Sequence, residues 1–155
     1  MKKLLVIATL FGVITLAQAG VSISSASFQE QIKVNENGER VKEWVKTSKV
    51  VPGTIIRYIN RLYNDGKVSA TNLVINNPIP KNMEYVANSA SCQDGCSISY
   101  SVDGGKTFKE PMELFLGVGE NRHLARASEY TDIRWLVSRL DANMQSSVEY
   151  KARLK

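Results

Sequence analysis

The sequence has one histidine and two cysteines among 155 residues, which limits the chemistry it can perform. Nucleophilic catalysis by serine or cysteine needs a histidine or an equivalent base beside the nucleophile. His123 is the only histidine, and its irregular, polar surroundings predict a solvated side chain. The nucleophile motif G-x-S-x-G is also absent. We therefore expect a protein that is not an enzyme and has no cofactor, with a small hydrolase using His123 as the competing interpretation.

Metal-binding patterns are equally scarce. No D-x-D-x-D run of the calcium-loop type occurs in the chain. Asp65, Asp94 and Asp103 each stand in a separate predicted turn, where aspartate is common for geometric reasons. A calcium site would require these turns to converge at one end of the fold, so we predict no metal site.

Long hydrophobic runs are missing after the N-terminus. Lys2 and Lys3 precede the apolar run Leu4–Leu16, and Ala17-Gln18-Ala19 has the small-x-small pattern of a cleavage site. The apolar run is too short for the roughly 20 residues that span a bilayer, so residues 1–19 are predicted to be a signal peptide rather than an uncleaved anchor. Residues 20–155 are then expected to form a single exported domain with no membrane span, located in the periplasm, secreted, or on the cell surface.

Excess positive charge is modest. The formal net charge of +5 falls to +3 when Lys2 and Lys3 are removed with the signal peptide. The remaining cations alternate with apolar residues or lie in loops, which is typical of a solvated strand face. Neither this pattern nor an exported location favours a nucleic-acid partner.

The two cysteines, Cys92 and Cys96, lie four positions apart in a polar segment. In an exported protein such a pair is expected to form a disulfide, in this case around the short loop 93–95. A redox-active pair would more typically be C-x-x-C at a helix N-terminus. The predicted disulfide therefore fixes a loop tip and contributes little global stability.

The stretch from Val51 to Pro80 gives the clearest strand pattern. Residues 54–63 are rich in β-branched and aromatic side chains, Asn64-Asp65-Gly66 predicts a tight turn, and residues 69–76 predict a second strand. Alternation places Ile56, Tyr58, Asn60 and Leu62 on a core-facing side, where Asn60 would need hydrogen-bond partners. We expect these two strands to form a hairpin at the centre of the fold.

Similar alternation predicts further short strands around this pair. Residues 20–47 favour a long hairpin, or two edge strands, around Asn37-Gly38, with a short helix over 38–47 as the alternative. The other predicted strands cover residues 83–87, 98–100, 107–108, 112–116, 131–140 and 147–154, and residues 110–128 form a long irregular loop. Short strands at regular spacing predict an all-β fold, an antiparallel immunoglobulin-like β-sandwich of about seven to nine strands, with a barrel as the structural rival.

Residues 50–90 resemble a known family. Pro52-Gly53, Tyr58, Asn64-x-Gly66, Ala70-x-Asn72, Pro80 and Tyr85 follow the pattern of the conserved-repeat domain of bacterial surface and secreted proteins, catalogued as domain of unknown function number eleven. Asn77 and Asn60 depart from that pattern, which more often has aspartate and an apolar residue. The resemblance implies an immunoglobulin-like surface or stalk module without catalytic residues.

A second resemblance is local. Ser101-Val102-Asp103-Gly104-Gly105-Lys106-Thr107-Phe108 is similar to the Asp-box, a structural hairpin of sialidases and other β-propellers. Asp103 is suited to accept backbone N–H groups across the turn, and Gly105 to adopt positive φ. A single copy cannot build a propeller, so we interpret it as a folding device.

Aromatic residues give the main indication of binding. Trp44, Tyr63 and Tyr130 fall on polar faces or at strand ends, where they could contact a glycan or a protein, or cover an edge of the sandwich. The sequence thus favours an exported structural or adhesive module of the cell envelope, with envelope proteins or surface polymers as partners. The alternative is a periplasmic protein- or ligand-binding domain that acts through an open sheet edge.

Overall fold

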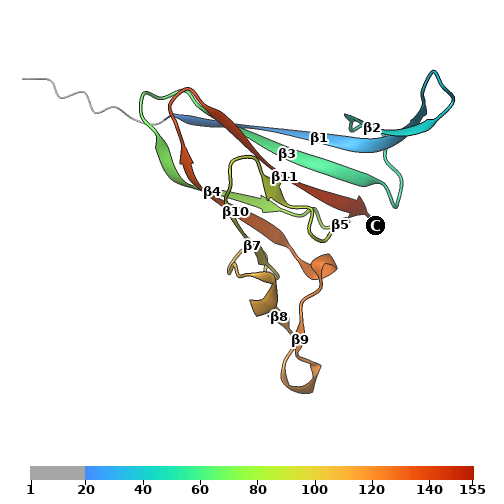
Figure 1. The fold of residues 1–155 in the computed structure, drawn as a ribbon. Coiled ribbons are helices and arrows are strands. Elements are labelled where there is room, and N and C mark those ends of the chain that lie inside the picture. The colour runs from blue at the N-terminus through green and yellow to red at the C-terminus, as the bar shows by residue number, and fades with distance from the viewer. Residues whose placement is uncertain (1–19) are drawn as a thin grey trace, which may run out of the picture.

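The computed structural model describes residues 20–155, so the predicted signal peptide lies outside the described residues. Two antiparallel sheets pack against each other, which confirms the predicted all-β sandwich (Figure 1). The large sheet has the order β2-β1-β3-β11-β5, with β6 also paired to β11. Its strands are β1 (Val21–Val34), β2 (Arg40–Lys46), β3 (Ile55–Asn64), β5 (Met83–Tyr85), β6 (Ser91–Cys92) and β11 (Gln145–Leu154). The small sheet has the order β4-β10-β7, formed by β4 (Ala70–Pro78), β7 (Ser97–Ser101) and β10 (Asp132–Leu140).

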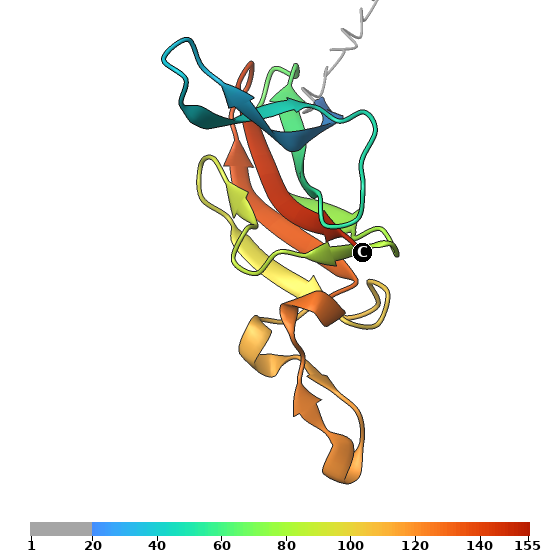
Figure 2. The same ribbon diagram turned by 90° about the vertical axis from the view of Figure 1, so that its right-hand side faces the viewer.

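The predicted irregular loop is a finger that projects from the sandwich (Figures 1 and 2). It carries the two-residue strands β8 (Phe115–Leu116) and β9 (His123–Leu124), which pair with each other. Three short 3-10 helices accompany them: η1 (Pro111–Glu113), η2 (Gly119–Asn121) and η3 (Ala127–Glu129). Of the strand predicted over 112–116, only Phe115–Leu116 is formed, because Met112 and Glu113 belong to η1. The strand predicted at 107–108 is reduced to a single bridge between Tyr100 and Lys109.

The core is formed by the strand faces that the two-residue alternation of apolar side chains predicted to point inward. Ile133, Trp135 and Val137 of β10 are fully buried, as are Val148, Tyr150 and Ala152 of β11. Met83 and Tyr85 on β5 and Ile75 on β4 complete the apolar layer between the sheets. These residues confirm the predicted inward faces.

The predicted hairpin over residues 54–76 is wrong in its pairing. β3 lies between β1 and β11 in the large sheet, whereas β4 pairs with β10 in the small sheet. The turn after β3 therefore carries the chain from one sheet to the other, and the turn between β10 and β11 does the same. In consequence β4 is an edge strand rather than a central one.

The side chain of Asn64 connects these two crossings, the turns in which the chain passes from one sheet to the other. Its fully buried side chain donates from Nδ2 to the carbonyls of Val68 and Leu140, 2.8 and 3.0 Å away. Its Oδ1 accepts from the N–H of Gly66 at 3.1 Å. These hydrogen bonds hold the turn after β3 against the end of β10, where the chain changes sheets.

Asn60 is buried and has the hydrogen-bond partners that a buried amide requires. Its Oδ1 accepts from Ser25 Oγ at 2.7 Å, and its Nδ2 donates to Asn77 Oδ1 at 3.0 Å. Asn77 in turn donates to the hydroxyl of Tyr150 at 2.9 Å. The network links β1, β3, β4 and β11, so it ties the two sheets together at a satisfied polar site.

The N-terminal hairpin is confirmed, and the alternative helix over 38–47 is not formed. β1 pairs with β3 through Gln29 and with β2 from Phe28 to Val34, so the β1–β2 hairpin extends beyond β3. Cys92 and Cys96 form the predicted disulfide, and Cys92 lies opposite Val148 at the edge of the large sheet.

The Asp-box turn is built as the sequence predicted. Asp103 Oδ1 accepts from the N–H groups of Lys106 and Thr107, both at 3.0 Å, and Oδ2 accepts from Thr107 Oγ1 at 2.7 Å. Gly104 and Gly105 both have positive φ. The Arg134 guanidinium lies 3.7 Å from the centre of the Phe108 ring.

We expect the hydrogen bonds that stabilise this turn to weaken at low pH. The hydrogen bonds from Thr107 hold the pKa of Asp103 well below its ordinary value of 3.8. Because the pKa is lower in the folded state, the contribution to stability is complete above about pH 4 and declines as the pH falls further. Amide exchange of Lys106 and Thr107 should therefore accelerate below about pH 4, relative to the intrinsic rate, in the wild type but not in Asp103→Asn. Equal pH dependence in both proteins would contradict the assignment.

Candidate functional site

The outer face of the large sheet carries a concentration of positive charge. Strand register places seven cations on this face against three carboxylates. The cations are Arg40, Lys42, Lys46, Arg57, Arg61, Lys151 and Arg153, and the carboxylates are Glu30, Glu84 and Glu149. Only Lys42 and Arg57 form ion pairs on this face among residues 20–155, with Glu30 and Glu149. The other five cations leave the face positively charged.

A cleft of about 350 Å³, which we call the Trp44 cleft, opens on this face. It lies across four neighbouring strands of the large sheet and is lined by Phe28, Trp44, Arg57, Ile59, Arg61, Ser147 and Glu149. Ile59 is only 8% exposed, although it points to the outer face. The cleft thus combines buried aliphatic surface, two half-buried aromatic rings and charged groups.

Charged groups surround the Trp44 ring. The Arg57 guanidinium carbon lies 6.0 Å from the ring centre, and Lys151 Nζ lies 5.4 Å from it. Arg57 Nε also donates to Glu149 Oε2 at 3.1 Å, which fixes both side chains. Glu149 Oε1 and the Arg61 guanidinium have no hydrogen-bond partner in the described part of the chain. The Arg61 guanidinium and one carboxylate oxygen of Glu149 are therefore available to a ligand in one cleft.

The three predicted binding aromatics have different outcomes. Trp44 lines the cleft, and Tyr63, which is 43% exposed, lies farther along β3 on the same outer face. Tyr130 is buried rather than exposed on a polar face, and it lines a different cavity. It packs against Tyr85 and Tyr100 with ring centres 5.8 and 4.7 Å apart, because the end of the finger folds back onto the core.

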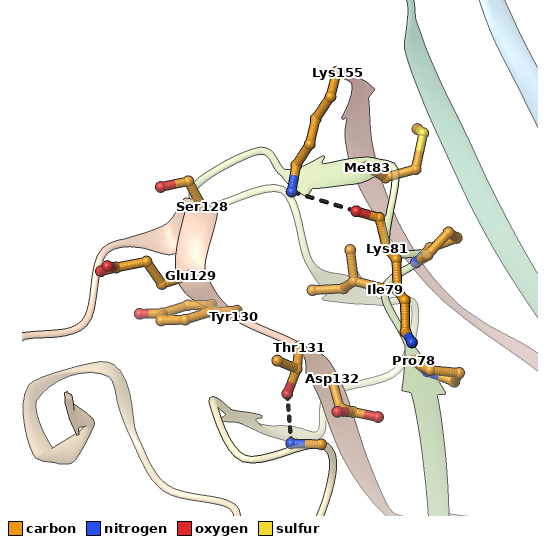
Figure 3. A pocket seen from close by; sticks show the side chains of 12 residues that line it. Pro78, Ile79, Lys81, Met83, Ser128, Glu129, Tyr130, Thr131, Asp132 and Lys155 are labelled. Carbon is orange, nitrogen blue, oxygen red and sulfur yellow. Dashed lines mark hydrogen bonds between the residues drawn. The ribbon is translucent and has the colours of Figure 1, made fainter. Parts of the chain in front are cut away.

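A larger cavity of about 600 Å³ lies at the end of the sandwich beside Tyr130 (Figure 3). Ile79 and Tyr130 line it, while the side chains of Ser128 and Glu129 point away from it (Figure 3). Two of its polar groups bond to the chain itself. Thr131 Oγ1 accepts from the N–H of Gly104, and Lys155 Nζ donates to the carbonyl of Lys81. The side chains of Lys81 and Asp132 also line it and form no hydrogen bond within residues 20–155, so this cavity too has polar groups available to a ligand.

His123 is exposed on the finger and both of its ring nitrogens are engaged. Nδ1 lies 3.2 Å from the carbonyl of Asn121, and Nε2 lies 3.3 Å from Glu129 Oε1. Hydrogen bonds from Arg126 lower the pKa of Glu129 to about 2, so this carboxylate stays ionised beside the imidazole. Arg126 and Glu129 thus form an ion pair on the finger, and the His123 ring lies against its carboxylate.

Asp65, Asp94 and Asp103 lie in three separate connections, as the sequence indicated. Within residues 20–155 no three histidine, cysteine or acidic side chains gather in a way that could hold a metal ion. The same residues contain no helix with the length and hydropathy needed to cross a bilayer.

Comparisons with family models, curated proteins and solved structures found no match to this chain. The resemblance of residues 50–90 to the conserved-repeat domain therefore stays a prediction.

Phe28, Arg57, Arg61 and Glu149 were not predicted as site residues. The alternation in residues 54–63 does place Arg57 and Arg61 on one face with Tyr63. What the sequence did not contain was the register that brings Trp44 of β2 and Phe28 of β1 beside them.

Proposed function

We propose that the protein is an exported, non-enzymatic structural or adhesive module of the cell envelope that holds its partner on the outer face of the large sheet. The observation that carries this proposal is the Trp44 cleft. Partly buried aromatic rings with polar groups beside them are characteristic of binding surfaces, because they offer a large contact area with few rotamers to order.

The scaffold supports this role. The cleft residues lie on paired strands, and the Arg57–Glu149 pair fixes the cleft wall before any ligand arrives. A rigid surface loses little conformational entropy on binding, so more of the contact energy appears as affinity. A module that works by adhesion needs this arrangement and no reacting group.

Trp44→Ala is expected to weaken binding of residues 20–155 to isolated envelope material about thirtyfold, since a buried tryptophan anchor is typically worth about 2 kcal/mol or more. A sedimentation or surface-binding titration measures the effect. Phe115→Ala is the matched control, because Phe115 is an exposed aromatic under the cation of Arg122 but lies on the finger. Unchanged binding by Trp44→Ala, equal losses in both variants, or a hydrolytic activity abolished by a point mutation would contradict the proposal.

A second candidate function is strand addition at the edge of the small sheet. β4 pairs only with β10, so its other edge has no strand beside it in residues 20–155. The inner face of β1 is also uncovered next to it: Ile23 is 55% exposed, and a cavity of about 260 Å³ opens between Ser25, Ser27, Tyr58 and Asn77. A partner strand would complete the small sheet and cover this surface.

Hydrogen exchange distinguishes this candidate from the first. Strand addition predicts that β4 amides facing the free edge become protected when the envelope partner binds. Protection confined to β2, β3 and β11 would eliminate strand addition and agree with binding at the Trp44 cleft.

A further inference from the structure

We propose that the Trp44 cleft binds an acidic polysaccharide whose sugar rings bear carboxylate groups. This inference rests on the proposed adhesive function and names its ligand class. It requires three features of the face together: an aromatic and aliphatic wall, an available guanidinium in the cleft, and further cations on the same outer face.

The wall suits a sugar ring. Ile59, Trp44 and Phe28 give the cleft apolar surface for the C–H face of a pyranose. Ser147 and the available Glu149 Oε1 supply groups for its hydroxyls. A volume of about 350 Å³ lies within the usual range for small-ligand sites, so one sugar unit has room to enter.

The guanidinium suits a carboxylate. Arg61 lines the cleft and forms no ion pair in the described part of the chain, whereas Arg57 is held by Glu149. Arginine binds carboxylates through two parallel hydrogen bonds, which lysine does not reproduce. A uronate unit with its ring in the cleft would thus have its charge matched by Arg61.

The surrounding face suits a polymer rather than a single sugar. Lys46, Lys151 and Arg153 lie on the same outer face and form no ion pairs among the described residues. A chain with one carboxylate per unit would meet these cations in turn, and binding would weaken as salt screens the contacts. Glu149 within the cleft favours a ligand that presents hydroxyls over a chain of phosphates.

The test is a titration of residues 20–155 with polygalacturonate, with three comparison polymers. Dextran has sugar rings without charge, polyglutamate has carboxylates without sugar rings, and single-stranded DNA has phosphates. We expect polygalacturonate to bind at least tenfold more tightly than each of the others at about 0.15 M salt. Equal affinity for polyglutamate or DNA would overturn the inference, because charge alone would then suffice.

Two variants test whether a carboxylate of the polymer binds at Arg61. Arg61→Gln should weaken polygalacturonate binding at least tenfold, since it removes the cation in the cleft. Arg153→Gln removes a cation from the same face outside the cleft and should change the affinity less than threefold. Equal effects of the two variants, at matched thermal stability, would overturn the placement of the carboxylate.

Failure of the inference is distinguishable from failure of the proposed function. If envelope binding depends on Trp44 but polygalacturonate neither binds nor competes, the adhesive function stands and the ligand class is wrong. If envelope material does not bind at all, the proposed function itself is wrong.

Discussion

Trp135→Ala is expected to lower the free energy of unfolding by about 3–5 kcal/mol, because it removes the largest side chain that the core buries completely. Trp135 lies on β10, the central strand of the small sheet. Its ring lies 6.1 Å from that of Tyr150 on the large sheet, and its Nε1 donates to the carbonyl of Ser91 at 3.1 Å. Truncation would leave a cavity between the sheets and an unpaired carbonyl beside the disulfide loop.

Urea unfolding followed by circular dichroism measures this loss without relying on tryptophan fluorescence. Trp44→Ala is the matched control, because it removes the same side chain from a half-buried position on the outer face, where we expect a cost below about 1 kcal/mol. Comparable losses in the two variants would show that Trp135 does not anchor the contact between the sheets.

Asn64→Ala is expected to destabilise the protein by about 3 kcal/mol. The substitution removes three hydrogen bonds and leaves the carbonyls of Val68 and Leu140 and the N–H of Gly66 without their side-chain partner. Two of these groups belong to the crossing after β3, and Leu140 ends β10 at the other crossing. The loss should therefore raise amide exchange at both crossings together.

The control for Asn64 is Asn82→Ala, an exposed asparagine in the turn before β5, with an expected cost below about 0.5 kcal/mol. If Asn64→Ala lowered the free energy of unfolding by less than about 1 kcal/mol, Asn64 would not stabilise the two crossings as we propose. Faster exchange at only one crossing would show that the two turns are independent.

Much of the sandwich was predictable because one side of each strand is buried. The two-residue period selected the inward faces of β3, β10 and β11, where Leu62, Trp135 and Tyr150 are almost fully buried. The pairing of β3 and β4 was not predictable in this way. A hairpin and a crossing between sheets place alternating residues around the same turn signal, so local alternation does not distinguish them.

The candidate site was likewise predictable only in part. The shared face of Arg57, Arg61 and Tyr63 follows from local alternation, and Trp44 was selected as an aromatic on a polar face. Their neighbourhood depends on pairings across β2, β1 and β3 that no local pattern specifies. Tyr130 was misplaced because its exposure depends on how the finger returns to Tyr85 and Tyr100.

The chain contains two tryptophans, and their indole N–H groups report separately on the cleft and on the core. Trp44 lines the proposed cleft, while Trp135 is buried with its Nε1 bonded to Ser91. We predict that adding short polygalacturonate oligomers shifts the indole N–H resonance of Trp44 in a saturable manner and leaves that of Trp135 unchanged. A Trp44 signal that stays in place at oligomer concentrations that saturate binding to the protein would contradict binding at this cleft.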